Sequence, residues 1–242
     1  MRNLVGLCAV GMAALLGSGM ASNAWSAVFL DDNFDAEAVP PGGWVRNDAA
    51  FINFDVVTGT VDLLAGGNPF GLVGSGTNST GNVIDLDGST MAGGTLQTKS
   101  SFAFNAGDVV TLSLDVGGNQ RTGVDDLFAG FRFTGAPGIT GATATGFGAP
   151  VLSPGMLTGT TNLDFTDPFQ VFTISFTATS AGSVSAFVGT DSADNRGPLL
   201  DRVTLSDLAA DIPEPASWAL IIIGFGGIGG VLRRGRERSA RA

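Results

Sequence analysis

Residues 110–116, VTLSLDV, decide the fold, and residues 172–179, FTISFTAT, repeat their pattern. Apolar and small polar side chains alternate in both runs, as they do in a β-strand that has one buried face. Similar short runs begin near Phe29, Phe51, Thr60, Val83, Leu96, Leu127, Val184 and Leu199. About ten strands without helical periodicity predict an all-β fold, an antiparallel β-sandwich of the jelly-roll type.

The composition supports this fold class. Glycine accounts for 37 of 242 residues and charged residues for only 14%, which is typical of a turn-rich β protein. We expect one sandwich domain over residues 28–211. Within it, Gly135–Asn162 is rich in glycine, threonine and proline and is predicted to be a long surface loop.

The charge of this domain is strongly negative. Residues 28–211 contain 20 acidic and 6 basic side chains, a net charge of −14. Such a domain repels polyphosphate, so we expect no nucleic-acid partner, and its charge serves solubility or attracts divalent cations.

The residue inventory excludes several kinds of catalysis. The chain contains no histidine and no tyrosine, and its one cysteine, Cys8, lies in the N-terminal apolar run. Ser-His and Cys-His nucleophilic mechanisms therefore have no base, and the mature domain has neither a disulfide nor a cysteine nucleophile.

Residues 1–27 have the form of a secretory signal peptide. Arg2 precedes an apolar stretch over residues 4–16, and small residues follow. Cleavage after Ala24 fits best, and cleavage at Ser26 or Ala27 stays open. The alternative is an uncleaved membrane anchor, for which the apolar stretch is short.

The other end of the chain, residues 212–242, has the form of a membrane anchor. It contains 213-PEPASWALIIIGFGGIGGVLRRGRERSARA-242. The uncharged residues 216–232 predict a single transmembrane helix of about 25 Å. The basic tail 233–242 places the C-terminus in the cytoplasm and the acidic domain outside. The glycines also match a G-x-G-x-x-G spacing, but no strand and helix surround them as a dinucleotide site requires.

This segment resembles a PEP-CTERM sorting signal of the variant with tryptophan and alanine after the triplet. The resemblance is carried by Pro213, Glu214, Pro215, Trp218, Ala219, Arg233, Arg234 and Arg236. It implies export by the general secretion machinery, removal of the leader by signal peptidase, transient anchoring in the inner membrane and processing by an exosortase. The protein would then reach the cell surface or the extracellular matrix. The alternative is a permanent tail anchor.

The ends of the sandwich domain resemble the terminal strands of galactose-binding-like jelly-roll modules. The segments concerned are 29-FLDDNFDAEAVPPGGW-44 and 194-DNRGPLLDRVTLSDL-208. The resemblance implies a structural calcium ion bound by Asp35, Glu37 and Asp201. The alternative is that these carboxylates are solvated or cap turns, and no other cofactor is expected.

Three further acidic groups invite a functional interpretation. These groups are Asp85 to Gly88, then Asp191 with Asp194 and Asn195, and lastly Asp125 with Asp126. The first lacks the remaining ligands of an EF-hand loop and predicts a strand that ends in a turn, and the second is more simply a solvated turn. The third could supply the two carboxylates of a glycoside hydrolase only if they faced each other across a groove.

Trp44 is the best candidate for a ligand contact, because sugars stack on flat aromatic side chains. Aromatic residues are otherwise mostly phenylalanines at core spacing. We therefore expect a non-catalytic cell-surface or matrix protein. The alternative is a module that binds carbohydrate of the cell surface or exopolysaccharide, and Trp44 exposed beside convergent polar groups would favour it.

Overall fold

A computed structural model describes residues 26–75, 80–209 and Phe225. The strands are β1 (Ser26–Asp32), β2 (Trp44–Asp48), β3 (Phe54–Thr58), β4 (Val61–Leu64), β5 (Val83–Asp85), β6 (Thr95–Thr98), β7 (Phe102–Phe104), β8 (Val109–Gly117), β9 (Val124–Thr134), β10 (Ile139–Thr145), β11 (Val151–Ser153), β12 (Met156–Asp164), β13 (Gln170–Ala178), β14 (Gly182–Gly189) and β15 (Leu199–Leu208).

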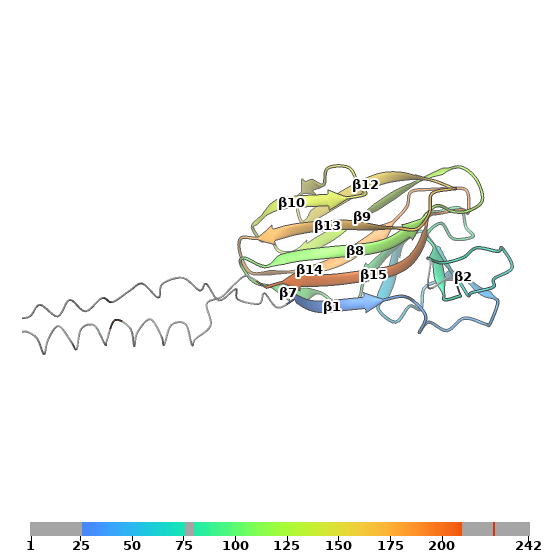
Figure 1. Cartoon of the computed structure of the whole chain (residues 1–242), viewed down its shortest axis with the longest axis horizontal. Coiled ribbons are helices and arrows are strands. Elements are labelled where there is room, and N and C mark those ends of the chain that lie inside the picture. The colour runs from blue at the N-terminus through green and yellow to red at the C-terminus, as the bar shows by residue number, and fades with distance from the viewer. Residues whose placement is uncertain (1–25, 76–79, 210–224, 226–242) are drawn as a thin grey trace, which may run out of the picture. The chain divides into compact units, whose positions relative to one another are not determined.

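The strands form two antiparallel sheets that face each other (Figure 1). The first has the order β10-β13-β8-β15-β5-β4-β2, with β1 also paired to β15. The second has the order β11-β12-β9-β14-β6-β3, with β7 also paired to β14. From β12 to β15 the chain changes sheet at every connection, so neighbours within a sheet are distant in sequence. The all-β class and the antiparallel sandwich are therefore confirmed.

The core lies between the sheets and is largely aromatic. Phe176 of β13 is fully buried, and its ring meets the rings of Phe104, Phe131 and Phe133 at centroid distances of 5.5, 5.1 and 5.3 Å. The interplanar angles of 74–85° are the edge-to-face geometry that aromatic quadrupoles favour. The alternating runs of β8 and β13 supply the buried faces, as predicted.

The structure corrects the prediction of a long surface loop over Gly135–Asn162. Strand β10, strand β11 and most of β12 lie in this stretch. In β12, Leu157, Gly159 and Leu163 are buried on one face, so the period of two is present. Gly159 takes one of the buried positions because a Cβ there would lie 3.0 Å from Phe147 and from Ile174. Because glycine is also common in turns, the glycine that packing requires here made this strand look like a loop in the sequence.

The two predicted terminal segments lie almost entirely outside the described residues. Of the signal peptide 1–27, the structure describes only Ser26 and Ala27, which already belong to β1. Of the sorting segment 212–242, with its triplet, transmembrane helix and arginines, it describes only Phe225. In the part of the chain that is described, no helix has the length and apolar character needed to cross a membrane.

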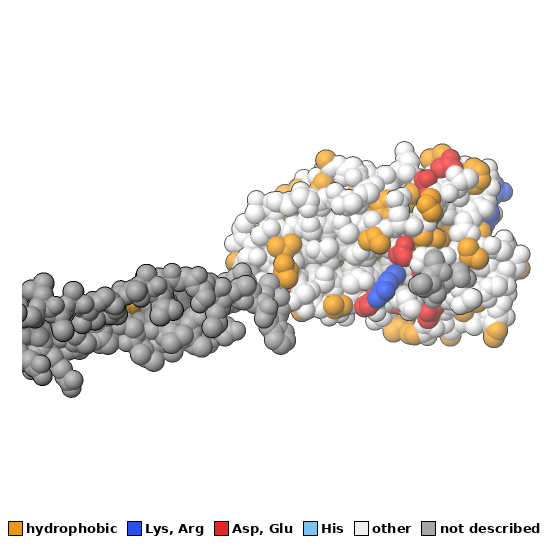
Figure 2. All heavy atoms as spheres, in the orientation of Figure 1, with side chains coloured by type: hydrophobic (Ala, Val, Ile, Leu, Met, Phe, Trp, Pro, Cys, Tyr) orange, Lys and Arg blue, Asp and Glu red, His pale blue; other side chains and the backbone are white. Residues whose placement is uncertain are grey.

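Charge is unevenly spread over the sandwich. On the face in Figure 2, charged side chains gather over the half nearer β2, and the half that carries β10 and β7 shows few. The uncharged half agrees with the sequence, because Phe133–Leu163 contains no charged residue. On this face, the charged side chains thus lie toward the end that carries β2.

Candidate functional site

A cleft of about 240 Å³ opens beside β2, β4 and β5. Its lining comprises Trp44, Arg46, Asp62, Leu64, Phe70, Asp85, Ser89, Arg121 and Asn195. These residues come from three strands and from loops more than 100 residues apart in sequence. The cleft joins an aromatic wall to a set of charged and hydrogen-bonding groups.

Trp44 forms part of the aromatic wall. A turn at Gly42 (φ 63°) and Gly43 leads into β2, where Trp44 pairs with Leu64 of β4. The indole packs against a small apolar cluster of Leu64, Leu72, Val83 and Leu199, yet it stays partly exposed. Packing on one side fixes the ring, and the cleft receives the other side.

Phe70 supplies the second aromatic ring of the wall. Its centroid lies 5.1 Å from that of Trp44 at an interplanar angle of 79°, and 44% of the residue is exposed. The buried Asn68 side chain holds the loop that presents it. Its Nδ2 donates to the carbonyls of Ala65 (3.0 Å) and Leu72 (2.7 Å), and its Oδ1 accepts from the Phe70 amide (3.1 Å). The ring is therefore placed before any ligand arrives.

Asp62 and Ser89 form a hydrogen-bonded polar wall. Asp62 Oδ2 accepts from Ser89 Oγ at 2.7 Å, and Oδ1 accepts from the Asn47 amide at 2.7 Å. Asp62 also lies directly opposite Asp85 in the β4–β5 register. The two carboxylates are thus neighbours on one wall and do not face each other across the cleft.

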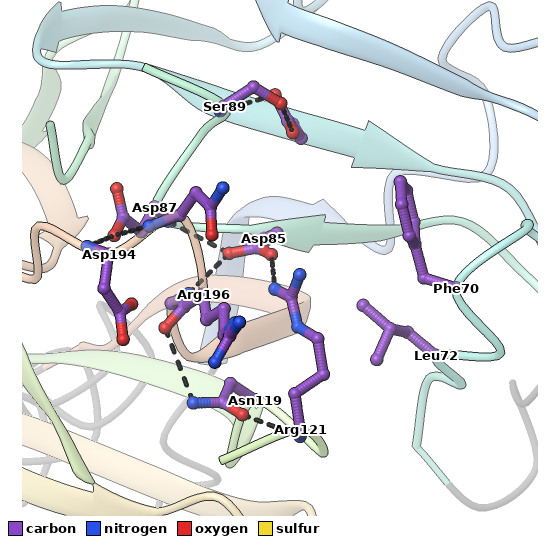
Figure 3. Close-up of polar contacts among 12 residues, drawn as sticks. Phe70, Leu72, Asp85, Asp87, Ser89, Asn119, Arg121, Asp194 and Arg196 are labelled. Atoms are coloured by element: carbon purple, nitrogen blue, oxygen red, sulfur yellow. Dashed lines mark hydrogen bonds and ion pairs between the residues drawn. The ribbon is translucent and has the colours of Figure 1, made fainter. Parts of the chain in front are cut away.

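Buried Asp85 and half-buried Arg121 form an ion pair next to this wall (Figure 3). Arg121 Nη2 donates to Asp85 Oδ2, while Asp85 Oδ1 accepts from the Gly197 amide (2.7 Å) and the Asp87 amide (3.1 Å). Burial raises the pKa of Asp85 to about 7, although the Arg121 charge and the two amides act in the opposite direction. Asn119 Oδ1 accepts from the Arg121 amide at 2.7 Å and so fixes the start of the arginine side chain.

Asp87 anchors the loop that brings Asn195 to the cleft. Asp87 is fully buried, and its Oδ2 accepts from the amides of Asp194 and Asn195, both at 2.9 Å (Figure 3). Burial raises the pKa of this carboxyl above its usual value. The prediction that β5 ends in a turn after Asp85 is confirmed. The exposed Asp194 and Asn195 belong to a loop that this buried carboxylate holds.

Arg46 lies at the exposed edge of the cleft. Its guanidinium carbon is 5.3 Å from the centroid of the Trp44 ring, a cation–π contact. Within the described part of the chain Arg46 forms no ion pair. Its exposed guanidinium thus lies close to any ligand that stacks against the indole.

The residues predicted to bind calcium are held by separate partners. Asp35 accepts from the Asn82 amide (2.8 Å), Glu37 from the Ile52 amide (2.7 Å), and Asp201 from Ser75 Oγ (2.6 Å). Burial raises the pKa of Glu37. Among the residues the structure describes, no three acidic side chains are grouped as a metal site requires. The calcium site of Asp35, Glu37 and Asp201 stays a prediction.

Asp125 and Asp126 do not form a pair across a groove. They are consecutive in β9, so their side chains point to opposite faces of the sheet. Asp125 is buried and accepts from Asn119 Nδ2 (2.7 Å) and Ser192 Oγ (2.8 Å). Asp126 accepts from the Asp191 amide at 3.0 Å. Both carboxylates fasten loops at the ends of strands.

Comparison with known proteins gives a distant likeness of fold. No family model matches the sequence, and no curated protein matches it significantly. A similar solved structure is that of the CBM22-1 and GH10 modules of endo-1,4-beta-D-xylanase 10B from Clostridium thermocellum, complexed with xylohexaose. The identity is 13% and the TM-score 0.40, over 74% of this chain and 28% of that chain. A likeness this distant carries no argument about the ligand.

Proposed function

We propose that this sandwich binds a glycan in the Trp44 cleft and performs no chemistry on it. The observation that carries the proposal is the fixed pair of partly exposed rings, Trp44 and Phe70, beside convergent hydrogen-bonding groups. A sugar ring offers a C–H face to an aromatic side chain and hydroxyl groups to polar neighbours, so it matches both walls. This arrangement favours a glycan-binding module over a purely structural matrix protein.

The absence of catalysis in this proposal follows from how the two acidic residues of the cleft are used. Asp62 and Asp85 lie side by side, and their oxygens accept hydrogen bonds from Ser89, backbone amides and Arg121. Glycoside hydrolysis instead needs two carboxyl groups on either side of the scissile bond. Release of reducing sugar from a bound glycan would overturn this part of the proposal.

The proposal includes delivery to the cell surface or the extracellular matrix. The PEP-CTERM resemblance supports export, transient anchoring in the inner membrane and exosortase processing. Ser26 and Ala27 belong to β1, and this supports leader cleavage after Ala24, which would leave the strand whole. Mass spectrometry of the mature protein from its native cells should find the chain to begin at Trp25 and to lack the basic tail 233–242. A mature chain that retains this tail would contradict exosortase processing.

Binding is best measured by isothermal titration calorimetry on the full chain. The detergent should carry no sugar headgroup, and the panel should contain soluble neutral and acidic polysaccharides. Trp44→Ala should weaken binding about 10-fold, because the stacking surface is removed. Leu152→Ala is the matched control, since Leu152 is 58% exposed on β11 and outside the cleft. No bound glycan, or equal affinities for the native chain and Trp44→Ala, would refute the proposal.

A further inference from the structure

Cationic side chains are scarce in this domain, and they gather near the cleft. Only six lie between residues 28 and 211, against 20 acidic residues. Arg46 and Arg121 line the cleft, and Arg196 follows the lining residue Asn195. In an acidic domain, half of the cations thus lie at or next to one site.

The other three cations are engaged elsewhere. Lys99 and Arg202 pair with Asp55 and Asp31 at 4.0 and 2.6 Å. The Arg132 guanidinium lies 5.2 Å from the ring centroid of Phe187. None of the three lines the cleft. The gathering at the cleft is therefore not a general feature of the surface.

Of the four charged side chains that line the cleft, only Arg46 is exposed. Arg121 pairs with Asp85, which is almost completely buried. Asp62 is also buried, and its two oxygens accept from the Asn47 amide and from Ser89. Both carboxylates thus belong to the walls, whereas Arg46 is exposed at the edge.

Arg46 lies where it can bind a substituent of a ligand that stacks on Trp44. Its guanidinium is held near the indole at 5.3 Å, so a sugar ring against the aromatic wall brings its substituents close to these donors. A planar guanidinium matches the two oxygens of a carboxylate with parallel hydrogen bonds. A neutral hydroxyl has a single oxygen and cannot accept this parallel pair of bonds.

We infer that the glycan is acidic and that Arg46 pairs with the carboxylate of a uronic acid residue stacked on Trp44. The inference rests on the proposed glycan site and names the class of sugar that it selects. The remaining surface is negative and repels a continuous polyanion. The site therefore suits an isolated uronate or the end of a chain better than the middle of a densely charged polymer.

The test compares trigalacturonate with its fully methyl-esterified form, which lacks the negative charges and carries a methyl group on each carboxyl. Calorimetry uses the full chain at about 0.1 M salt, where charges more than about 10 Å apart are largely screened. The native chain should bind the acid at least about 10-fold more tightly than the ester. Arg46→Gln should remove this preference, because the affinity for the acid falls more than the affinity for the ester.

The matched control is Arg132→Gln, which removes the same charge and the same kind of cation–π contact from the other sheet. It should keep the preference for the acid. Equal affinity of the native chain for acid and ester, or retention of the preference in Arg46→Gln, would overturn the inference while glycan binding still stands. Binding of a sulfated galactan oligosaccharide but not of trigalacturonate would overturn the assignment of a carboxylate. Failure of every glycan in the wider panel would instead refute the proposed function.

Discussion

Replacing Arg121 with glutamine tests the ion pair in the wall of the cleft. In the native chain, burial raises the pKa of Asp85 to about 7 despite the neighbouring guanidinium. Well below that pH, the folded chain carries a protonated Asp85, which needs no cationic partner. Above it, Asp85 is ionised, and removal of Arg121 leaves a buried charge uncompensated. The variant should therefore be destabilised more at alkaline pH than at acidic pH.

The magnitude follows from proton linkage. If Asp85 stays protonated in the variant, the variant lacks the free energy that the native fold gains by ionising it, which is about 2 kcal/mol near pH 8.5 and less than about 0.1 kcal/mol near pH 5.5. Loss of the hydrogen bond itself adds about 1 kcal/mol at both pH values. In the native chain, the direction in which Asp85 changes stability with pH depends on its pKa in the unfolded state, which is about 3.9. Between about pH 4 and pH 7 the unfolded chain binds fewer protons than the folded one, so Asp85 lowers native stability as pH rises.

Urea unfolding followed by far-ultraviolet circular dichroism measures the loss of stability near pH 5.5 and near pH 8.5. The control is Arg202→Gln, because Arg202 pairs with Asp31 at the surface, where the two side chains are 55% and 43% exposed. The Arg202 hydrogen bond lowers the pKa of Asp31 from its usual value, so Asp31 is ionised at both pH values. This control should lose at most about 1 kcal/mol, equally at each pH. An equal loss for Arg121→Gln at the two pH values would refute the raised pKa.

Three further outcomes are expected. Phe176→Ala should cost about 3–5 kcal/mol in urea unfolding, since a fully buried ring that meets three others is removed, and a loss below about 1 kcal/mol would contradict this packing. Gly130→Ala should destabilise the chain by at least about 1–3 kcal/mol, because a Cβ there would lie 1.9 Å from the Leu157 carbonyl oxygen; unchanged stability would contradict the close approach of β9 and β12. Adding calcium or a chelator should leave the melting temperature within about 1 °C, since Asp35, Glu37 and Asp201 each accept a hydrogen bond from a different donor of the fold, and a larger shift that saturates with calcium would reveal a site.

The sandwich could be predicted because strand alternation is a local property. Val110, Leu112 and Leu114 are alternate residues of one short run and therefore share a face. That this face is buried can be predicted without knowing which strand pairs with it. Every run identified by this period corresponds to a strand. The alternating pattern is hidden where close packing requires a glycine, as at Gly159. Glycine has no side chain that marks a buried face, and it is also common in turns.

Of the residues that line the cleft, the sequence singled out Trp44 as a ligand contact and named Asp85 and Asn195 only as members of acidic groups. The ligand contact of Trp44 stays a prediction, and the signal was a flat aromatic side chain in a domain whose other aromatic residues are mostly phenylalanines at core spacing. Asn68 in a Gly-Asn-Pro turn marks the loop that presents Phe70, so this aromatic residue could have been noticed from its turn chemistry. The Asp85–Arg121 pair spans 36 positions and depends on which loops meet at the end of the sandwich. No local pattern contains that information.

Strand β15 connects two opposite ends of the sandwich. Its last residue, Leu208, pairs with Ser26, and its first, Leu199, pairs with Asp85 of the cleft wall. The strand covers about 30 Å at 3.3 Å per residue. Were the chain held at its C-terminal side while a ligand held the cleft, tension would act along β15. The hydrogen bonds to β8 and β1 lie across that direction, so they would be sheared together and would not be unzipped one by one. The hydrogen bonds that hold β15 in the sheet would then also give the domain its resistance to this force.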